Sequence, residues 1–232
     1  MLSQSLLQSP PDNMRPAIAV DLEGTLTAGS AWQGMSEYLI AHGREREAKR
    51  YFFRHIPEYF LRKWTGRGLR EFKNRWILGF LQLFQGYSEA EFREMTEWAV
   101  ENELWPQRRQ IVIDEIGQHQ RLGRRVMVVT GLFEPYVASM IDRLPEVEAI
   151  GTPMIFEDGL VTGRLAMPFN VGPRKAEALA PFTQDGKIYS AYGDTGSDRY
   201  MLEMSRHPVA VHPDETLRSL AESEGWRIVD EK

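Results

Sequence analysis

The 232-residue sequence contains no cysteine, which excludes disulfide bonds, thiolate nucleophiles and zinc sites with cysteine ligands. The lack of disulfides agrees with a reducing compartment, and we expect a cytoplasmic protein. Basic residues are not in excess, because 28 Lys and Arg stand against 33 Asp and Glu, so the charge indicates no nucleic-acid partner. Apolar runs are too short for a signal peptide or a transmembrane segment, and we expect neither.

Several catalytic patterns are missing as well. The five histidines are never spaced like metal ligands, and the sequence has neither a Gly-x-Ser-x-Gly elbow nor a Walker phosphate-binding loop. Repeats of fixed period and low-complexity tracts are absent too. With 42% apolar and 26% charged residues, the composition is that of a globular protein with a substantial core.

The sequence changes character twice along its length. Residues 17–21, AIAVD, begin with a short apolar run that is typical of a buried strand. Residues 31–104 follow a helical pattern, in which Ser88 and Glu91 are spaced as a capping box. Strands and helices alternate from Pro106 onward, and Pro106 is suited to open the first of these helices. Breaks in the helical segment are expected at Gly43, at Pro57 and at residues 66–68.

Alternating strands and helices indicate parallel crossover units in a doubly wound sheet. We therefore expect an α/β fold with a mainly parallel, Rossmann-like sheet, built discontinuously from residues 16–28 and 105–232. Residues 29–104 would form an inserted all-helical cap, and residues 1–15 a flexible polar tail. Within the core the pattern predicts strands at 124–130, 187–194, 208–212 and 226–229, helices at 107–123, 135–144, 174–182, 197–204 and 214–225, and a hairpin that turns at Asp158 and Gly159.

Three polar residues stand where predicted strands end, namely Asp21, Thr130 and Asp194. Because ligands bind beyond the carboxyl ends of the strands in open α/β sheets, we expect these residues to converge on one crevice. Lys175 lies near the start of a predicted helix, where backbone N–H groups also favour anions. Carboxylates, a hydroxyl and an ammonium group suit an oxyanion held beside a divalent cation such as Mg2+.

Four segments resemble, in order, the motifs of the haloacid dehalogenase (HAD) superfamily. DLEGTLT at 21–27 is similar to the first motif, usually Asp-x-Asp-Gly-Thr, and YGDTGSD at 192–198 is similar to the fourth, Gly-Asp-Ser/Thr-x-x-Asp. VMVVTG at 126–131 and GPRKAEAL at 172–179 resemble the second and third. The helical insertion and the closing run PVAVHPDETLRSLAESEGW further resemble subfamily IB, the phosphoserine-phosphatase-like hydrolases.

The resemblance implies a role for each matched residue. Asp21 would be the nucleophile that becomes an aspartyl-phosphate. Thr130 would hydrogen-bond the transferring phosphoryl group, with Gly131 beside it in contact with the substrate. Lys175 would neutralise the phosphoryl charge and orient the nucleophile. The Mg2+ site would be formed by Asp21, Asp194 and the backbone carbonyl of Glu23, with support from Asp198.

Glu23 departs from the family motif, whose second acid is an Asp that protonates the leaving alcohol and then activates water. Glu has nearly the same intrinsic pKa, but its extra methylene moves the carboxyl, and a misplacement of ~1 Å can cost ~100-fold in rate. Three interpretations follow: a general acid/base in a reshaped site, a slow enzyme that keeps phosphate and metal binding, or a loop residue that points to solvent.

Residues 44–75 carry eleven Lys and Arg against four Glu, interleaved with aromatic residues. This pattern fits a helical hairpin with an aromatic core and a solvated basic face. It also fits an electropositive lid that attracts anionic substrates, or a peripheral membrane surface that contacts acidic lipid headgroups. The candidate substrate contacts in this segment are Arg54, Arg62 and Arg70.

Together these features predict a Mg2+-dependent phosphomonoester hydrolase that acts through an aspartyl-phosphate on a small phosphorylated metabolite. Phosphoserine is the nearest family substrate. The alternative is a catalytically weakened HAD-fold protein with a binding or regulatory role, which the replacement of the usual Asp by Glu23 suggests.

Overall fold

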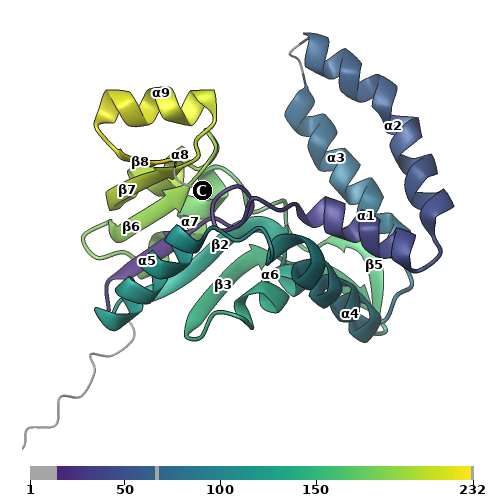
Figure 1. Cartoon of the computed structure of the whole chain (residues 1–232), viewed down its shortest axis with the longest axis horizontal. Helices are drawn as coiled ribbons and strands as arrows, with labels where there is room; N and C mark the ends of the chain where they lie inside the picture. The colour runs from purple at the N-terminus through teal and green to yellow at the C-terminus, as the bar shows by residue number, and fades with distance from the viewer. Residues whose placement is uncertain (1–14, 66–67, 231–232) are drawn as a thin grey trace, which may run out of the picture.

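The computed structural model describes residues 15–65 and 68–230, apart from the side chains of residues 69–71. Its core is a six-stranded sheet in the order β3-β2-β1-β6-β7-β8, and all neighbouring strands are parallel (Figure 1). This doubly wound order confirms the predicted Rossmann-like fold. The strands are β1 (Ala17–Val20), β2 (Arg125–Phe133), β3 (Val147–Thr152), β6 (Ile188–Gly193), β7 (Ser205–Val211) and β8 (Arg227–Val229).

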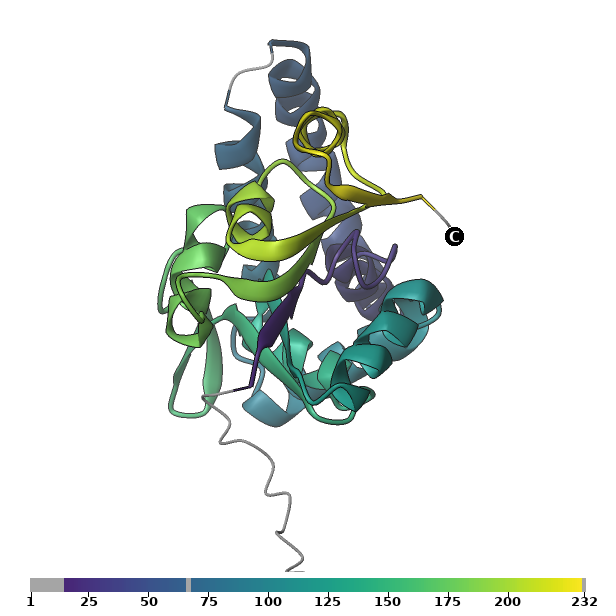
Figure 2. The same cartoon turned by 90° about the vertical axis from the view of Figure 1, so that its left-hand side faces the viewer.

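Helices cover both faces of the sheet, as Figure 2 shows. Successive residues of β1 point to opposite faces, so this central strand is apolar throughout. Ile18 and Val20 pack in one cluster with residues of α5 and α6, whereas Ala17 and Ala19 pack in another with residues of α7, α8 and α9. These helices are α5 (Gln110–Arg121), α6 (Glu134–Ile141), α7 (Pro173–Leu179), α8 (Arg199–Glu203) and α9 (Glu215–Glu224).

The cap is inserted between β1 and α5. It consists of α1 (Ala31–Ala41), α2 (Glu45–Thr65), α3 (Leu69–Leu81), the short helix η2 (Gln82–Phe84), α4 (Glu89–Ala99) and the π-helical turn η3 (Val100–Leu104). Figure 1 shows α2 and α3 as a hairpin that projects away from the sheet. The capping box of α4 is confirmed, because Ser88 and Glu91 exchange backbone and side-chain hydrogen bonds. Within the described part of the chain, each helix is too short or too polar to cross a bilayer.

A hairpin from the core segment completes the cap. β4 (Met154–Glu157) and β5 (Leu160–Leu165) are antiparallel and turn at Asp158 and Gly159, as predicted. The N–H of Gly86 donates to the carbonyl of Val161 at 2.9 Å, and the N–H of Val161 donates to the carbonyl of Tyr87 at 2.8 Å. The loop between η2 and α4 thus finds its hydrogen-bond partners on a strand, and the cap is helical with a two-stranded addition.

The helix predicted to open at Pro106 begins instead at Gln110. The N–H of Arg109 donates to the carbonyl of Leu26 at 2.8 Å, and the carbonyl of Gln107 accepts from the N–H of Ala28 at 2.9 Å. The backbone after Pro106 therefore pairs with the loop that follows β1 and cannot start a helix.

Other local predictions have mixed outcomes. Gly43 ends α1 with a positive φ of 77°, as expected, but α2 continues through Pro57 without a break. The strand β3 was not predicted, and β2 extends to Phe133 rather than ending at Thr130. The expected tail up to residue 14 and the break at residues 66–67 lie outside the described residues.

His119, in the last turn of α5, is a buried member of a chain of polar contacts that joins Arg124, Tyr192 and Glu115. Its Nδ1 accepts from Arg124 Nη1 at 2.8 Å, so the proton is on Nε2, which lies 2.8 Å from the Tyr192 hydroxyl. That hydroxyl donates to Glu115 Oε2 at 2.7 Å. Burial, together with the charge of Arg124, lowers the pKa of His119 to about 4.

This histidine should make stability depend on pH. Between pH 4 and 6.5 the unfolded chain binds a proton that the folded chain does not, so acidification in this range favours unfolding. We expect His119→Gln to remove a slope of at most about 1.4 kcal/mol per pH unit from the free energy of unfolding, measured by urea denaturation at several pH values. Parallel pH profiles for the wild type and the variant would contradict this assignment.

Candidate active site

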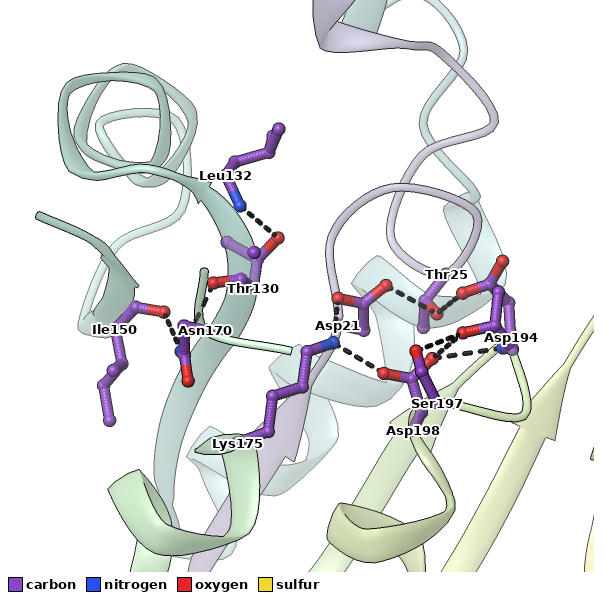
Figure 3. A network of polar contacts seen from close by, with 12 residues as sticks. Asp21, Thr25, Thr130, Leu132, Ile150, Asn170, Lys175, Asp194, Ser197 and Asp198 are labelled. Atoms are coloured by element: carbon purple, nitrogen blue, oxygen red, sulfur yellow. Dashed lines mark hydrogen bonds and ion pairs between the residues drawn. The ribbon is translucent and has the colours of Figure 1, made fainter. Parts of the chain in front are cut away.

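The carboxyl edge of the sheet brings the predicted polar residues together (Figure 3). Asp21 directly follows β1 and Asp194 directly follows β6, and these two strands are neighbours. Thr130 lies in β2, on the other side of β1, immediately after the regular pairing with β3 stops at Val129. The three residues therefore converge because their strands are adjacent and parallel.

The centre of this edge is a buried ammonium group between two carboxylates. Lys175 Nζ is 2.5 Å from Asp21 Oδ1 and 2.6 Å from Asp198 Oδ1, and all three side chains are less than a tenth exposed. Burial alone would lower the pKa of Lys175, but the two carboxylates outweigh it and raise this pKa above its ordinary value. Lys175 is therefore a fixed positive charge beside Asp21.

Asp198 is held by the turn between β6 and α8. Its Oδ2 accepts from the N–H of Thr195 at 3.1 Å and from the Thr195 hydroxyl at 2.9 Å. Gly193 permits this packing, because a Cβ there would lie 2.6 Å from the Cβ of Asp198. Burial raises the pKa of Asp198, but Lys175 and the bonds from Thr195 outweigh burial and hold this pKa below its ordinary value. Asp198 is thus an ionised group that orients Lys175.

Asp21, Asp194 and Asp198 form a set of oxygen donors that could hold a metal ion, since one oxygen of each lies within 4.8 Å of the others. Burial raises the pKa of Asp21 to about 6 despite Lys175. Burial and the neighbouring acids raise the pKa of Asp194 to about 8. Gly24, with a φ of 88°, leaves room for this acid, because a Cβ there would lie 1.9 Å from Asp194 Oδ2. Crowded carboxylates of this kind fit a hard divalent cation, whose charge would offset their repulsion.

Two further polar residues support the site. Thr25 Oγ1 lies 3.5 Å from Asp21 Oδ2 and 3.3 Å from Asp194 Oδ1. Thr25 is part of the first motif, so the sequence contained a signal for its place in the site. Asn170 Nδ2 donates to the carbonyls of Thr130 and Ile150, each at 3.3 Å, and so ties the ends of β2 and β3 together (Figure 3). No local pattern in the sequence distinguishes Asn170, because its partners come from distant strands.

A cavity of about 190 Å³ opens over these side chains, and we call it the catalytic cavity because the candidate site residues line it. Asn74 and Ile77 of α3 reach it from the cap, and neither was among the predicted site residues. The structure also brings to this cavity seven residues that the sequence predicted for the site: Asp21, Glu23, Thr130, Gly131, Lys175, Asp194 and Asp198.

Glu23 extends from the catalytic cavity to the cap. Its Oε1 accepts from the N–H of Ala31 at 2.7 Å and from the Ser30 hydroxyl at 3.2 Å, and it thereby caps the N-terminus of α1. These bonds contradict the interpretation of Glu23 as a solvent-pointing loop residue. Burial raises the pKa of Glu23 to about 7, although the bond from Ala31 opposes this shift. A carboxyl with a pKa near neutrality suits both donation and acceptance of a proton.

The predicted arginine contacts are not brought to the catalytic cavity. Arg54 is exposed on α2, and Arg62 pairs with Glu58 at 3.2 Å. The aromatic face of α2 packs toward α1 and α3, so these basic side chains point elsewhere. The side chain of Arg70 lies outside the described residues.

The fold and the site define a class of protein: a capped, doubly wound α/β protein with an aspartate, a lysine and further acids at one sheet edge. The family model of haloacid dehalogenase-like hydrolases matches residues 18–203. The chain therefore belongs to the HAD family of hydrolases, as its motifs predicted.

Individual relatives agree with this assignment. The chain is 28% identical to the phosphoserine phosphatase SerB1 of Mycobacterium tuberculosis over 236 residues, covering 96% of this chain and 73% of that protein. A protein of unknown function from Bordetella pertussis has a similar solved structure, with a TM-score of 0.77 at 22% identity, covering 93% and 98% of the two chains. A substrate-bound phosphoserine phosphatase shares the fold with a TM-score of 0.63 at 17% identity, covering 94% and 93%.

The ion triad predicts a large stability effect at Lys175. Lys175→Met would leave Asp21 and Asp198 buried without a counter-charge, and we expect the free energy of unfolding to fall by about 3–5 kcal/mol at pH 7 in EDTA. Urea denaturation measures this loss. Arg174→Met, which changes the partly exposed neighbour, should cost no more than about 0.5 kcal/mol. Equal losses in the two variants would refute the structural role of the triad.

Proposed function

We propose that the protein is a Mg2+-dependent phosphatase that hydrolyses phosphomonoesters through an aspartyl-phosphate on Asp21. The observation that carries this proposal is the buried contact of Asp21 with Lys175 inside a group of further acids. A carboxylate nucleophile needs an approaching anion to be neutralised, and Lys175 provides a fixed positive charge for it. The phosphatase names of relatives such as SerB1 support the same chemistry.

In the first step, a carboxylate oxygen of Asp21 attacks phosphorus, and the bond between phosphorus and the ester oxygen breaks. Lys175 balances the charge of the phosphoryl oxygens, and the hydroxyl of Thr130 donates a hydrogen bond to one of them. Glu23 in its protonated form transfers its proton to the departing oxygen, which leaves as an alcohol. The raised pKa of Glu23, about 7, keeps a protonated fraction available near neutrality.

In the second step, the now ionised Glu23 takes a proton from water, and the water oxygen attacks phosphorus. The bond between phosphorus and Asp21 breaks, and inorganic phosphate leaves. Lys175, held by Asp198, keeps the same position through both steps because its two ion pairs are buried. Splitting the transfer in this way replaces one difficult displacement with two easier ones.

The residues that would hold Mg2+ are Asp21, Asp194 and the backbone carbonyl of Glu23, with Asp198 in support. When bound, Mg2+ supplies a positive charge that stabilises the transferring phosphoryl group. The raised pKa values of Asp21 and Asp194 arise from burial and mutual repulsion, which a cation would relieve.

Hydrolysis of p-nitrophenyl phosphate tests the proposal. We expect turnover with Mg2+, its loss in EDTA, and a fall of about 1,000-fold or more in kcat for Asp21→Asn. The control Asp114→Asn, an exposed acid on α5, should keep wild-type activity. Turnover that survives Asp21→Asn would disprove the proposed nucleophile, and absent turnover with intact Mg2+ binding would favour the weakened binding or regulatory protein.

Shortening Glu23 tests whether the longer acid is fitted to this site. Asp at this position cannot reach both the N–H of Ala31 and the catalytic cavity, so we expect Glu23→Asp to lower kcat about 100-fold. Glu23→Gln keeps the length but cannot transfer the proton, and it should cost about 100- to 10,000-fold. A rise in kcat for Glu23→Asp would show that Glu23 is a decayed rather than a fitted residue.

A further inference from the structure

A second cavity of about 680 Å³ opens between α1, α2 and α3, beside the catalytic cavity. We call it the aromatic cavity. It shares Glu23, Asp194 and Ile77 with the catalytic cavity, so the two spaces meet at the site. Its volume lies in the range of pockets that enclose whole organic molecules, whereas the catalytic cavity has room for only a small group.

Three aromatic rings from three different helices form one wall of the aromatic cavity. The ring centroid of Trp32 is 5.6 Å from that of Phe52 and 5.5 Å from that of Trp76, and the last two are 5.5 Å apart. Trp76 also stacks at 5.5 Å on Phe80, which is fully buried. The wall is therefore set in place by packing before any ligand arrives. Its other apolar members are Ile56, Tyr59, Phe72 and Ile77.

This apolar surface is not covered by the protein itself. Trp32 is 41% exposed, Ile56 40% and Tyr59 36%, although each lines a concave space. Exposed apolar groups gathered in a cavity mark a binding site, because a ligand that covers them releases the surrounding water.

Charged groups are sparse in the aromatic cavity, and its two acids lie at the end that meets the catalytic cavity. Its acids, Glu23 and Asp194, also line the catalytic cavity. Among the described side chains that line the aromatic cavity, the basic ones are Lys73 and His55. An amino acid ester such as phosphoserine has a small leaving group, which would leave most of the aromatic wall uncovered, and its carboxylate would find only Lys73 and His55 as basic partners among the described side chains that line the cavity.

We infer that the substrates are phosphomonoesters whose leaving group is large, apolar and uncharged, and that this group binds in the aromatic cavity. The inference rests on the proposed phosphatase function and specifies its substrate class. With the phosphoryl group over Asp21 and the ester oxygen near Glu23, the rest of the molecule extends past Glu23 toward Trp32 and Trp76. The affinity for a substrate then increases with the apolar area that it covers, and each added methylene raises the binding constant up to about fourfold.

A series of alkyl phosphates tests this substrate class while the leaving-group chemistry stays constant. We expect kcat/KM for hexyl phosphate to exceed that for ethyl phosphate by about 30-fold or more, with phosphoserine near or below ethyl phosphate. All esters are used below their micelle-forming concentrations, so that dissolved molecules rather than a lipid surface supply the substrate. A flat series, or a preference for phosphoserine, would overturn the inference and leave the phosphatase function intact.

Neighbouring residues of α2 provide a matched pair of variants. Tyr59 lines the aromatic cavity, whereas Phe60 is 62% exposed and does not line it. We expect Tyr59→Ala to raise KM for hexyl phosphate about tenfold with kcat unchanged, because it removes binding that ground and transition states share. Phe60→Ala should change neither constant, and ethyl phosphate should not distinguish the two variants. Trp32→Ala, a partly exposed site on α1, repeats the test from another helix.

Binding of hexylphosphonate, which cannot be hydrolysed, gives a readout that does not depend on turnover. Isothermal titration calorimetry in Mg2+ should show binding that weakens about tenfold in Tyr59→Ala and in Trp32→Ala but not in Phe60→Ala. Absence of turnover on every ester would defeat the proposed function, and the calorimetry would then still test whether the aromatic cavity binds an apolar group. Equal affinity for hexylphosphonate and ethylphosphonate would overturn the inference about the cavity.

Discussion

The site depends on one electrostatic constraint, the burial of the Lys175 ammonium group between the carboxylates of Asp21 and Asp198. The three residues come from the end of β1, the start of α7 and the turn after β6. Separating any of these segments would leave an ionised group in the protein interior without a partner, which is far more costly than losing an exposed ion pair. The same constraint fixes the carboxyl of Asp21, whereas Asp194 lies outside the two ion pairs, and burial together with the neighbouring acids raises its pKa to about 8. The two buried ion pairs of Lys175 therefore set both the positions of the side chains that they join and their charges.

Much of the core could be predicted from the sequence because its signals are local. An apolar run followed directly by an acid marks β1 and Asp21, and a Gly-Asp turn marks the end of β6. The rule that parallel strands share a carboxyl edge then brings together residues that are far apart in the chain. The strand β3 escaped prediction for a physical reason. Its segment VEAIGT is short and contains Glu148, which is accommodated at the sheet edge by an ion pair with Arg125.

The cap was harder to predict, because its function depends on which way side chains point from long helices. Arg54 and Arg62 were selected for their charge, yet the packing of α2 on α1 and α3 turns them away from the catalytic cavity. Asn74 and Ile77 reach it from α3, and nothing in their immediate sequence marks them. Asn170 presents the same difficulty in the core, since its two carbonyl partners lie on separate strands. Such contacts arise from tertiary packing and leave no periodic pattern in the sequence.

The hydrogen bond from the N–H of Ala31 to Glu23 has a consequence for how chemistry and cap motion are related. The carboxyl of Glu23 is held by the first turn of α1, which belongs to the cap. Asp21, the proposed nucleophile, is held at the end of β1 in the sheet. Rotation of α1 away from the sheet would move the N–H of Ala31, and the carboxyl of Glu23 that is bonded to it would move away from Asp21. In the proposed mechanism, proton transfer by Glu23 would therefore depend on the position of the cap, because a displaced α1 would leave this carboxyl unable to protonate the leaving group or to activate water.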